Sequence, residues 1–209
     1  MIGTFRIGAV ILAGGRGSRM HSDIQKQYML LNGRPLISYA LEAFEQSIVD
    51  VMVLVTGAGE EDYVRQEILA PLHLKKLCGI VTGGKERYHS VYEGLKALQK
   101  CDYVLIHDGA RPLVKGEIIS RAAYAAMQDG ACVVGMPVKD TIKLVDTDSC
   151  IVDSPRRSLV WQAQTPQVFA VPLIAEAFAR QMKEDCSNVT DDAMVVEAQM
   201  GVKIHMTQG

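Results

Sequence analysis

Apolar runs that alternate with stretches of helical periodicity constrain the fold of this 209-residue chain more than any other feature. Runs that are apolar almost throughout are typical of parallel strands buried on both faces, because the connecting helices cover the sheet. We therefore predict an α/β fold with a Rossmann-like, mostly parallel sheet and helices on both faces. The expected strands are residues 8–13, 51–56, 77–81, 103–107 and 131–138, and the expected helices are residues 35–45, 60–69, 88–98 and 116–127.

Composition narrows the class of protein. With 48% hydrophobic residues the chain can bury a substantial core, so residues 1–209 are predicted to form a single domain. The formal net charge of −2 provides no overall field that would attract nucleic acid or a membrane. No segment is long enough to span a bilayer and no signal-peptide pattern is present, so we expect a cytoplasmic location. The five cysteines are scattered without a Cys-x-x-Cys pair, which predicts reduced thiols rather than disulfides or a zinc site.

The first predicted strand runs into the sequence Ala-Gly-Gly-Arg-Gly-Ser-Arg-Met, residues 13–20. Glycines lack a Cβ, so backbone N–H groups can approach phosphate oxygens, and two cations, Arg19 and Lys26, follow within reach. The loop lacks the Lys-Ser or Lys-Thr of a Walker A loop, and a methionine replaces the third glycine of a dinucleotide fingerprint. Two interpretations remain: the triphosphate cradle of a nucleotidyltransferase, or a strand-to-helix turn for which Gly14 and Gly15 would suffice.

Two further loops are expected at the same edge of the sheet. Right-handed crossovers between parallel strands place the loops that follow the strands along one edge, so residues 14–19, 83–90 and 108–112 should converge. The second of these loops is a Gly-Gly turn that opens a helix. Its amides and the Ser90 hydroxyl suit contacts with a base or sugar, although the same residues also fit a plain turn with Ser90 as a cap.

The third loop has the sequence His-Asp-Gly-Ala-Arg-Pro, residues 107–112. A carboxylate at the carboxyl end of a strand, beside a phosphate loop, suits the magnesium ion of a magnesium–triphosphate complex. Asp108 fits that role, but it also fits an Asx-turn or a cap, and Arg111 fits a structural ion pair. We interpret His107 as a hydrogen-bonded core residue rather than a base, because no nucleophile follows it.

Residues 139–158 depart from the alternation of strands and helices. Residues 139–146 alternate like a two-faced strand, and a turn then leads to a returning strand over 151–154, which predicts a β-hairpin. A solitary hairpin is marginally stable in water, so we expect this arm to protrude and to pack on a second copy of the protein. An Arg-Arg pair at its return end suits a phosphate, and also fits an exposed solvated pair. Beyond the arm, the expected elements are a helix over 173–182, a helix after the polar residues 188–192 and a strand over 202–207.

Several separate blocks of the sequence occur in the order found in one enzyme family. The chain resembles the 2-C-methyl-D-erythritol 4-phosphate cytidylyltransferases of the non-mevalonate isoprenoid pathway over essentially its whole length. Several blocks in family order are far more specific than one glycine loop. The blocks are residues 13–20, Lys26-Gln27-Tyr28, Gly83-Gly84 with Arg87 and Ser90-Val91, residues 107–112, Pro137-Val138-Lys139-Asp140-Thr141-Ile142-Lys143, Gln164-Thr165-Pro166-Gln167 and Thr190-Asp191-Asp192-Ala193.

The resemblance implies transfer of CMP from CTP to 2-C-methyl-D-erythritol 4-phosphate, which gives 4-diphosphocytidyl-2-C-methyl-D-erythritol and pyrophosphate. The substrate phosphate would attack the α-phosphorus directly and in line, and this anionic nucleophile needs no general base. Arg19 and Lys26 carry over as catalytic residues that stabilise the transition state. Mg²⁺ would lie mainly on the triphosphate oxygens, with Asp108 nearby as a tentative ligand.

The resemblance also implies two sets of binding residues. In the family the hairpin crosses to a partner subunit, so a homodimer is implied in which Thr141 and Arg157 complete the neighbour's site. The implied nucleotide-binding residues are Ala13, Gly14, Gly15, Gly17, Gly83, Gly84, Ser90 and Asp108. The implied substrate-binding residues are Asp108, Gly109, Arg111, Thr141, Arg157, Thr165 and Thr190.

Three departures from the family pattern qualify these expectations. Gln25 stands where a proline often precedes the catalytic lysine, which is expected only to loosen the loop. Lys85 stands where some members carry an acidic residue, so a side-chain contact to the base is not expected there. The family continues past Gly209 with an Asn-Ile-Lys segment, whose lysine helps to hold the substrate phosphate, and with a final helix. This chain lacks both, as a truncated sequence or a natural variant, and is expected to keep the fold with impaired activity.

Two alternative functions stay open. Ribitol 5-phosphate cytidylyltransferase, which serves teichoic acid synthesis, shares most of the blocks, and the choice of polyol depends on a few hydroxyl contacts. The alternative from another class is a catalytically impaired nucleotide-binding protein. Arg19, Lys26 and Asp108 argue against it, because a binding module does not need cations that stabilise a transition state.

Overall fold

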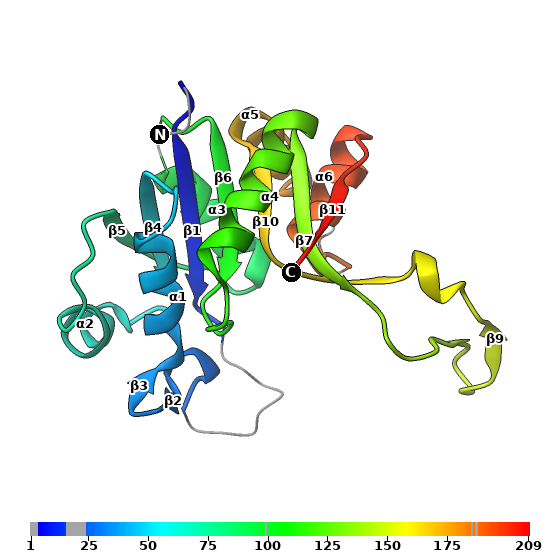
Figure 1. The fold of residues 1–209 in the computed structure, drawn as a ribbon, viewed down its shortest axis with the longest axis horizontal. Coiled ribbons are helices and arrows are strands. Elements are labelled where there is room, and N and C mark those ends of the chain that lie inside the picture. Colours follow the sequence, from blue (N-terminus) through cyan, green and yellow to red (C-terminus); the bar gives the residue numbers. More distant parts are fainter. Residues whose placement is uncertain (1–3, 16–23, 99, 185, 187) are drawn as a thin grey trace.

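The computed structural model describes residues 4–15, 24–98, 100–184, 186 and 188–209. Its centre is a seven-stranded sheet in the order β11-β7-β10-β6-β1-β4-β5 (Figure 1). Strand β10 is antiparallel to both of its neighbours, and all other pairs are parallel. The predicted mostly parallel α/β fold is therefore confirmed. The strands are β1 (Ile7–Ala13), β4 (Val51–Thr56), β5 (Leu77–Thr82), β6 (Tyr103–Asp108), β7 (Ala131–Pro137), β10 (Trp161–Ala170) and β11 (His205–Gln208).

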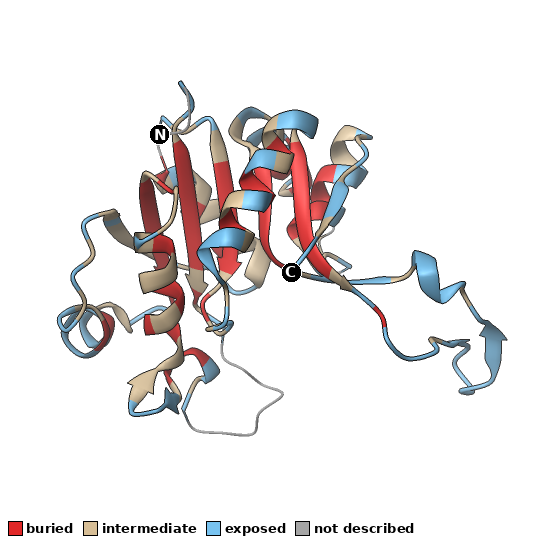
Figure 2. Ribbon diagram, viewed as in Figure 1, coloured by how far each residue is buried: buried red, intermediate tan, exposed pale blue. Residues whose placement is uncertain are grey.

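Helices cover both faces of this sheet, because alternate residues of each strand enter one of two apolar cores. Ile11 and Leu54 belong to the core under α1, η3 and α4, whereas Val10 and Val53 belong to the core under α3, α5 and α6. Strands β1, β4, β6 and β7 are accordingly buried along most of their length, whereas the edge strands β5 and β11 are not (Figure 2). The helices are α1 (Leu36–Glu45), α2 (Glu61–Tyr63), η3 (Val64–Leu69), α3 (Arg87–Ala97), α4 (Gly116–Asp129), α5 (Val171–Gln181) and α6 (Asp192–Met200).

The helix predicted over 60–69 differs from the observed structure. After one α-helical turn, α2, the chain continues as a π-helical turn, η3, in which the amide of Ala70 donates to the carbonyl of Arg65. The wider turn keeps Val64 and Ile68 fully buried in the core. Among the helices that the structure describes, none combines the length and the apolar content needed to cross a membrane.

Strand β10 contains the irregularity that matters most for the site. Its register against β7 shifts between Ala163 and Gln167, and the Thr165–Pro166 peptide bond within the shift is cis. A bulge of this kind re-aims side chains at the edge of a sheet. Here it brings Thr165 onto the end of β6, where its hydroxyl accepts a hydrogen bond from the backbone of Asp108 at 3.2 Å.

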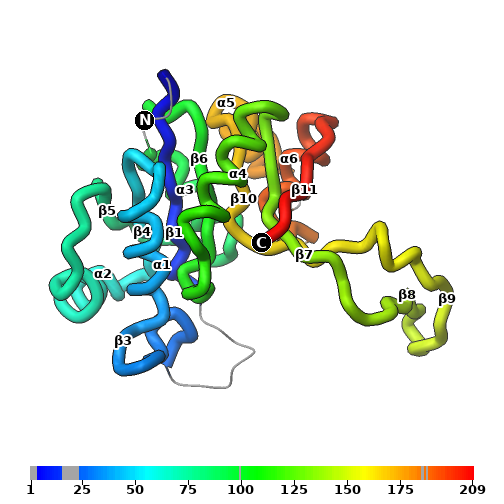
Figure 3. Tube along the Cα trace, in the orientation of Figure 1, coloured from blue at the N-terminus to red at the C-terminus, as the bar shows by residue number. Residues whose placement is uncertain are grey.

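The arm, residues 139–158, extends away from the sheet (Figures 1 and 3). It contains a short antiparallel pair, β8 (Leu144–Val145) and β9 (Ile151–Asp153), followed by the 3-10 turn η4 (Arg157–Leu159). The strand predicted over 139–146 is thus reduced to two paired residues, because the arm packs on no core that would extend the pairing. Its apolar side chains are exposed, up to 63% for Ile151. Dimerisation through the arm stays a prediction.

Candidate active site

The carboxyl ends of β1, β4, β5 and β6 meet at one edge of the sheet, where their loops contact one another. The Gly83 amide donates to the carbonyl oxygen of Thr56 at 2.7 Å, and the Gly109 amide donates to that of Leu12 at 2.8 Å. A Cβ on Gly14 would lie 3.3 Å from the same Thr56 oxygen. The predicted convergence of the three loops is confirmed for the described residues. Gly17 and Arg19 lie outside them.

The Gly-Gly turn after β5 is built around the Ser90 hydroxyl. A Cβ on Gly83 would lie 2.5 Å from this oxygen, so only glycine allows the turn to approach α3 so closely. The Ser90 hydroxyl accepts from the Gly84 amide at 3.2 Å and donates to the Glu86 carbonyl at 3.4 Å. Ser90 is thus buried as a packing residue that closes the Gly-Gly turn, whereas the N-cap of α3 is Glu86, and the contact of Ser90 with a base stays a prediction.

The segment that carries Lys26 is attached to the first glycine turn through its neighbour Gln27. The Gln27 side-chain amide, which is buried, donates to the carbonyl oxygens of Ala13 and of Gly15, the latter at 3.1 Å. Lys26 itself is exposed at the start of the 3-10 turn η2 (Lys26–Tyr28), ahead of the small hairpin β2 (Leu30–Leu31) and β3 (Arg34–Pro35). Its position beside the glycine turn is therefore fixed by a residue that the sequence analysis did not single out.

Asp108 lies between two arginines. Its carboxylate oxygens accept from Arg87 Nε at 3.3 Å and from Arg111 Nε at 3.2 Å. Burial alone would raise the pKa of the Asp108 carboxyl, but the positive charge of Arg87, together with His107 and Arg111, holds it below its ordinary value. The carboxylate therefore stays ionised at neutral pH.

Arg87 also forms a bidentate ion pair with Asp192, a residue 105 positions away. Both N–H···O distances are 2.8 Å, and the Asp192 side chain is only 1% exposed. Burial acts to lower the pKa of Arg87, yet pairing with Asp192 raises it above its ordinary value, so the guanidinium remains charged. The pair ties the first turn of α3 to the N-terminus of α6 and so orients the side of Arg87 that faces Asp108.

The N-terminus of α6 is held by β10 through a second buried side chain. Gln167 accepts from the amides of Asp192 and Ala193 at 3.1 and 2.9 Å and donates to Asp191 at 3.0 Å. Asp191 in turn caps the helix by accepting from the Met194 amide. Thr190 immediately precedes this capped turn, so the structure brings it to the same side of the sheet as Asp108.

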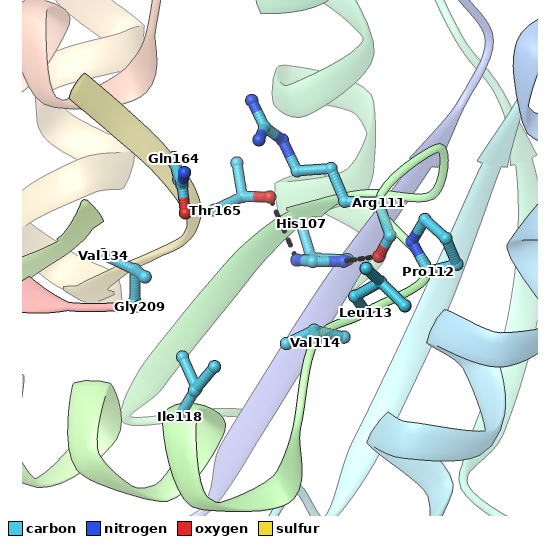
Figure 4. Close-up of a pocket in the computed structure, with 10 residues that line it drawn as sticks. All are labelled: His107, Arg111, Pro112, Leu113, Val114, Ile118, Val134, Gln164, Thr165 and Gly209. Carbon is cyan, nitrogen blue, oxygen red and sulfur yellow. Dashed lines mark hydrogen bonds between the residues drawn. The ribbon is translucent and has the colours of Figure 1, made fainter. Parts of the chain in front are cut away.

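His107 is a structural residue, as the sequence predicted. Its ring is fully buried, with Nε2 3.2 Å from the Arg111 carbonyl and Nδ1 3.0 Å from the Thr165 hydroxyl (Figure 4). A carbonyl can only accept, so Nε2 carries the proton and Nδ1 accepts from Thr165. Burial lowers the pKa of His107 to about 4. The neutral imidazole thus fixes the Asp108–Arg111 loop against β10.

A cavity of about 340 Å³ adjoins this loop. Its walls are mainly apolar, with Leu113, Val114 and Ile118 among them, and Arg111 and Thr165 contribute polar groups (Figure 4). Cavities of this size with a few polar groups are typical of small-molecule sites.

Two predicted substrate-binding residues are not brought to this edge. Thr141 and Arg157 lie on the arm, where both are exposed and Arg157 donates to the Lys139 carbonyl at 3.2 Å.

Within the described residues, no group of three metal-ligating side chains occurs. Asp108 is thus a single carboxylate beside the glycine turns, which suits a magnesium ion held mostly by phosphate oxygens and not one held by the protein alone.

Comparisons with known proteins agree on one family. Residues 7–209 match the family model described as 2-C-methyl-D-erythritol 4-phosphate cytidylyltransferase. A protein of that name from Lachnospira eligens is 50% identical over 200 residues, 95% of this chain and 88% of the relative, and one from Lachnoclostridium phytofermentans is 41% identical over 98% of this chain and 88% of the relative. The crystal structure of 4-diphosphocytidyl-2C-methyl-D-erythritol synthase from Anaerococcus prevotii matches with a TM-score of 0.87 at 29% identity, over 98% of this chain and 87% of that chain.

Proposed function

The chain belongs to the 2-C-methyl-D-erythritol 4-phosphate cytidylyltransferase family, and from that premise we propose that it transfers CMP from CTP to 2-C-methyl-D-erythritol 4-phosphate. The products are 4-diphosphocytidyl-2-C-methyl-D-erythritol and pyrophosphate. One observation carries the proposal: two glycine turns, an exposed lysine and the Asp108–Arg111 loop meet at one edge of the sheet. These parts suffice to hold a triphosphate, supply a cation to it and receive a second anionic substrate.

CTP occupies the two glycine turns in this proposal. The triphosphate lies on the turn that begins at Gly14 and Gly15, where bare backbone amides face the phosphates. The cytosine lies between Ala13 and the Gly83–Gly84 turn, with Ser90 holding that turn in shape.

The methylerythritol phosphate occupies the side of the site formed by Asp108, Gly109, Arg111, Thr165 and Thr190. Arg111 is one of the residues that line the cavity, and its guanidinium, which pairs with Asp108, provides a cation for the substrate phosphate. The ionised Asp108 carboxylate and the Thr165 hydroxyl offer hydrogen-bond partners for the polyol. The His107 contact keeps this loop in place while the substrate binds.

The reaction itself requires positioning and charge neutralisation rather than acid–base chemistry. The substrate phosphate oxygen is already an anionic nucleophile, and it attacks the α-phosphorus in line as pyrophosphate leaves. Lys26 and Arg19 stabilise the negative charge that spreads over the phosphoryl oxygens in the transition state. When bound, magnesium would supply further charge neutralisation; the triphosphate would hold most of it, with Asp108 as the neighbouring carboxylate.

A second subunit completes the site through the arm. Thr141 and Arg157 lie on the arm, where both are exposed, and the exposed apolar residues Leu144 and Ile151 offer a surface to a partner. We infer that the arm crosses to a second copy and delivers both residues to its site.

None of the five cysteines, all of which the structure describes, forms a disulfide, which is compatible with a cytoplasmic enzyme.

Pyrophosphate release tests the function directly. The purified chain is incubated with CTP and magnesium and with either 2-C-methyl-D-erythritol 4-phosphate or ribitol 5-phosphate. We expect release with the methylerythritol substrate, and a fall in kcat of about 10²–10³-fold in Lys26→Ala and in Arg19→Ala. Lys75→Ala, which removes an exposed lysine away from the loops, is the matched control and should keep full activity.

Release with ribitol 5-phosphate alone would contradict the substrate assignment and keep the mechanism. CTP binding without release from either substrate would contradict the enzymatic function and favour a nucleotide-binding protein.

A further inference from the structure

Three side chains from two loops form a hydrogen-bonded clasp next to the first glycine turn. Glu60, at the start of α2, accepts from the Tyr28 hydroxyl at 2.9 Å, from the Gly57 amide at 3.2 Å and from the side-chain amide of Gln25. One carboxylate thus joins its own loop, which follows β4, to both ends of the segment that carries Lys26. We call Gln25, Tyr28 and Glu60 the Glu60 clasp.

The segment inside the clasp has little stability of its own. It is a single 3-10 turn closed by the Tyr28 amide donating to the Gln25 carbonyl at 2.9 Å, and so short a helix depends on tertiary contacts. The Glu60 clasp supplies contacts at both ends, and Gln27 ties the middle to the glycine turn. The Tyr28 ring also packs edge-to-face on Tyr63 at 5.4 Å.

Lys26 is the exception among these four residues. Gln25, Gln27 and Tyr28 are each engaged by side-chain hydrogen bonds, whereas the Lys26 side chain is exposed and makes no hydrogen bond or ion pair with another described residue. Three residues of the turn are therefore held by hydrogen bonds, and the exposed side chain, that of Lys26, is the proposed catalytic cation. Gln25 was expected to loosen this loop where a proline often stands, but the structure shows its side chain bonded to both Glu60 and Gln27.

The hydrogen bonds of the clasp fit a positioning role. The oxygens of Glu60 accept from three donors of the protein, which orients the carboxylate within the clasp. Burial, reinforced by the hydrogen bond to Glu60, raises the pKa of Tyr28 above its ordinary value, so the hydroxyl stays protonated and can donate at neutral pH.

We propose that Glu60, acting with Tyr28 and Gln25, is a positioning residue that holds Lys26 beside the glycine turn for phosphoryl transfer. This inference rests on the proposed function and extends it to residues that do not contact substrate. A cation displaced by an ångström still attracts the triphosphate but stabilises the transition state less. Loss of the clasp should therefore lower kcat while the KM for CTP changes little.

Steady-state kinetics of four single variants and one double variant test the proposal. Glu60→Ala should lower kcat by about ten- to a hundredfold with less than about a twofold change in the KM for CTP. Tyr28→Phe, which removes only the hydroxyl donor, should lower kcat by about two- to tenfold. Asp62→Asn removes an exposed carboxylate two residues from Glu60 and should leave both constants unchanged.

The second part of the experiment is a double-mutant cycle with Lys26→Ala. If Glu60 acts through Lys26, then adding Glu60→Ala to Lys26→Ala should change kcat by less than about twofold. The same fall in both backgrounds would overturn the proposal, because Glu60 would then act elsewhere. An unchanged kcat in Glu60→Ala with a lowered Tm would also overturn it, because the clasp would then serve folding alone. Failure of the unaltered chain to release pyrophosphate would instead refute the proposed function, and with it this inference.

Discussion

Predicted substrate-binding residues occur both in the polar cluster around Asp108 and on the arm. These two regions differ in burial and in the number of polar contacts that fix their side chains. In the cluster, Asp192 and His107 are buried and every polar group of the ion pair and of the imidazole has a partner within 3.3 Å. On the arm, Ile151 and Val152 are more than 60% exposed. The arm contains the short β8–β9 pair, and within the described part of the chain none of its residues belongs to either apolar core (Figure 3).

This difference separates residues that one chain can position from residues that need a second surface. Buried hydrogen bonds and ion pairs fix the geometry of the cluster as soon as the chain folds, because a buried polar group without a partner is costly. The arm lacks such constraints, so its residues reach a defined position only when another surface binds it. Changes in the cluster should therefore affect stability, and changes on the arm should affect function alone.

The largest expected effect is the loss of the buried ion pair. Asp192→Ala removes the bidentate partner of Arg87 and leaves its half-buried guanidinium with Asp108 as its one ion-pair partner among the described residues. We expect the free energy of unfolding to fall by about 3–5 kcal/mol, measured by denaturant titration. Arg157→Ala, the matched removal of a charge from the arm, should change it by less than about 0.5 kcal/mol.

A cycle with Arg87→Ala checks the cause. The double variant Arg87→Ala/Asp192→Ala should be less destabilised than the sum of the two single variants, because no unpaired charge remains buried. Equal destabilisation by Asp192→Ala and Arg157→Ala would remove the contrast between the two regions.

A second effect of nearly the same size should appear in acid. His107 has a pKa of about 4 in the folded protein, below its ordinary value of 6.5, because it is buried. Between these values the unfolded chain binds a proton that the folded chain does not. The free energy of unfolding should therefore fall by about 3 kcal/mol as the pH drops from 6.5 to 4, apart from other groups.

His107→Gln isolates this contribution. Its amide can donate to the Arg111 carbonyl and its carbonyl can accept from Thr165, and it does not titrate. The variant should show a shallower loss of stability between pH 6.5 and 4 than the unaltered chain, whereas His73→Gln, at an exposed position, should not. Identical slopes for all three proteins would mean that His107 is not buried in its neutral form.

The sequence predicted the central sheet well because its signals are local. Near-continuous apolar runs and helical periodicity identified β1, β4, β5, β6 and β7 with the helices between them. The direction of β10 and its shift near Thr165 depend on contacts with distant strands, so no local pattern predicted them. The arm pairs over fewer residues than its alternation suggested, because alternation predicts a strand only where one face has something to pack on.

The sequence predicted that the loops of the candidate site converge, but it did not predict the side chains that hold these loops in place. Glycines and a following Asp or Arg mark loops that face a ligand, and His107 was correctly assigned to the core. The partners Arg87 and Asp192 lie 105 residues apart, and Tyr28 and Glu60 lie 32 residues apart. No local pattern in the sequence predicts either contact. The available signal was that Tyr28, Arg87 and Asp192 fall within blocks of the family resemblance, whereas Glu60 falls in none of them.

The last prediction joins the two regions in one experiment. If the arm completes a partner's site, Lys26→Ala disables the site of its own subunit, whereas Arg157→Ala disables the site of the other subunit. Each variant alone should therefore be nearly inactive. In an equal mixture of subunits, unfolded together and refolded, half of the dimers contain both variants, and each of these has one intact site.

The mixture should recover about a quarter of the activity of the unaltered protein. A mixture of Lys26→Ala with Arg19→Ala is the control. Each of these changes disables the site of its own subunit, so every site in the mixture lacks one of the two cations. Recovery in the first mixture but not in the second would place Arg157 in the neighbour's site. No recovery in the first mixture, with mixed dimers present, would show that Arg157 does not act in the neighbour's site.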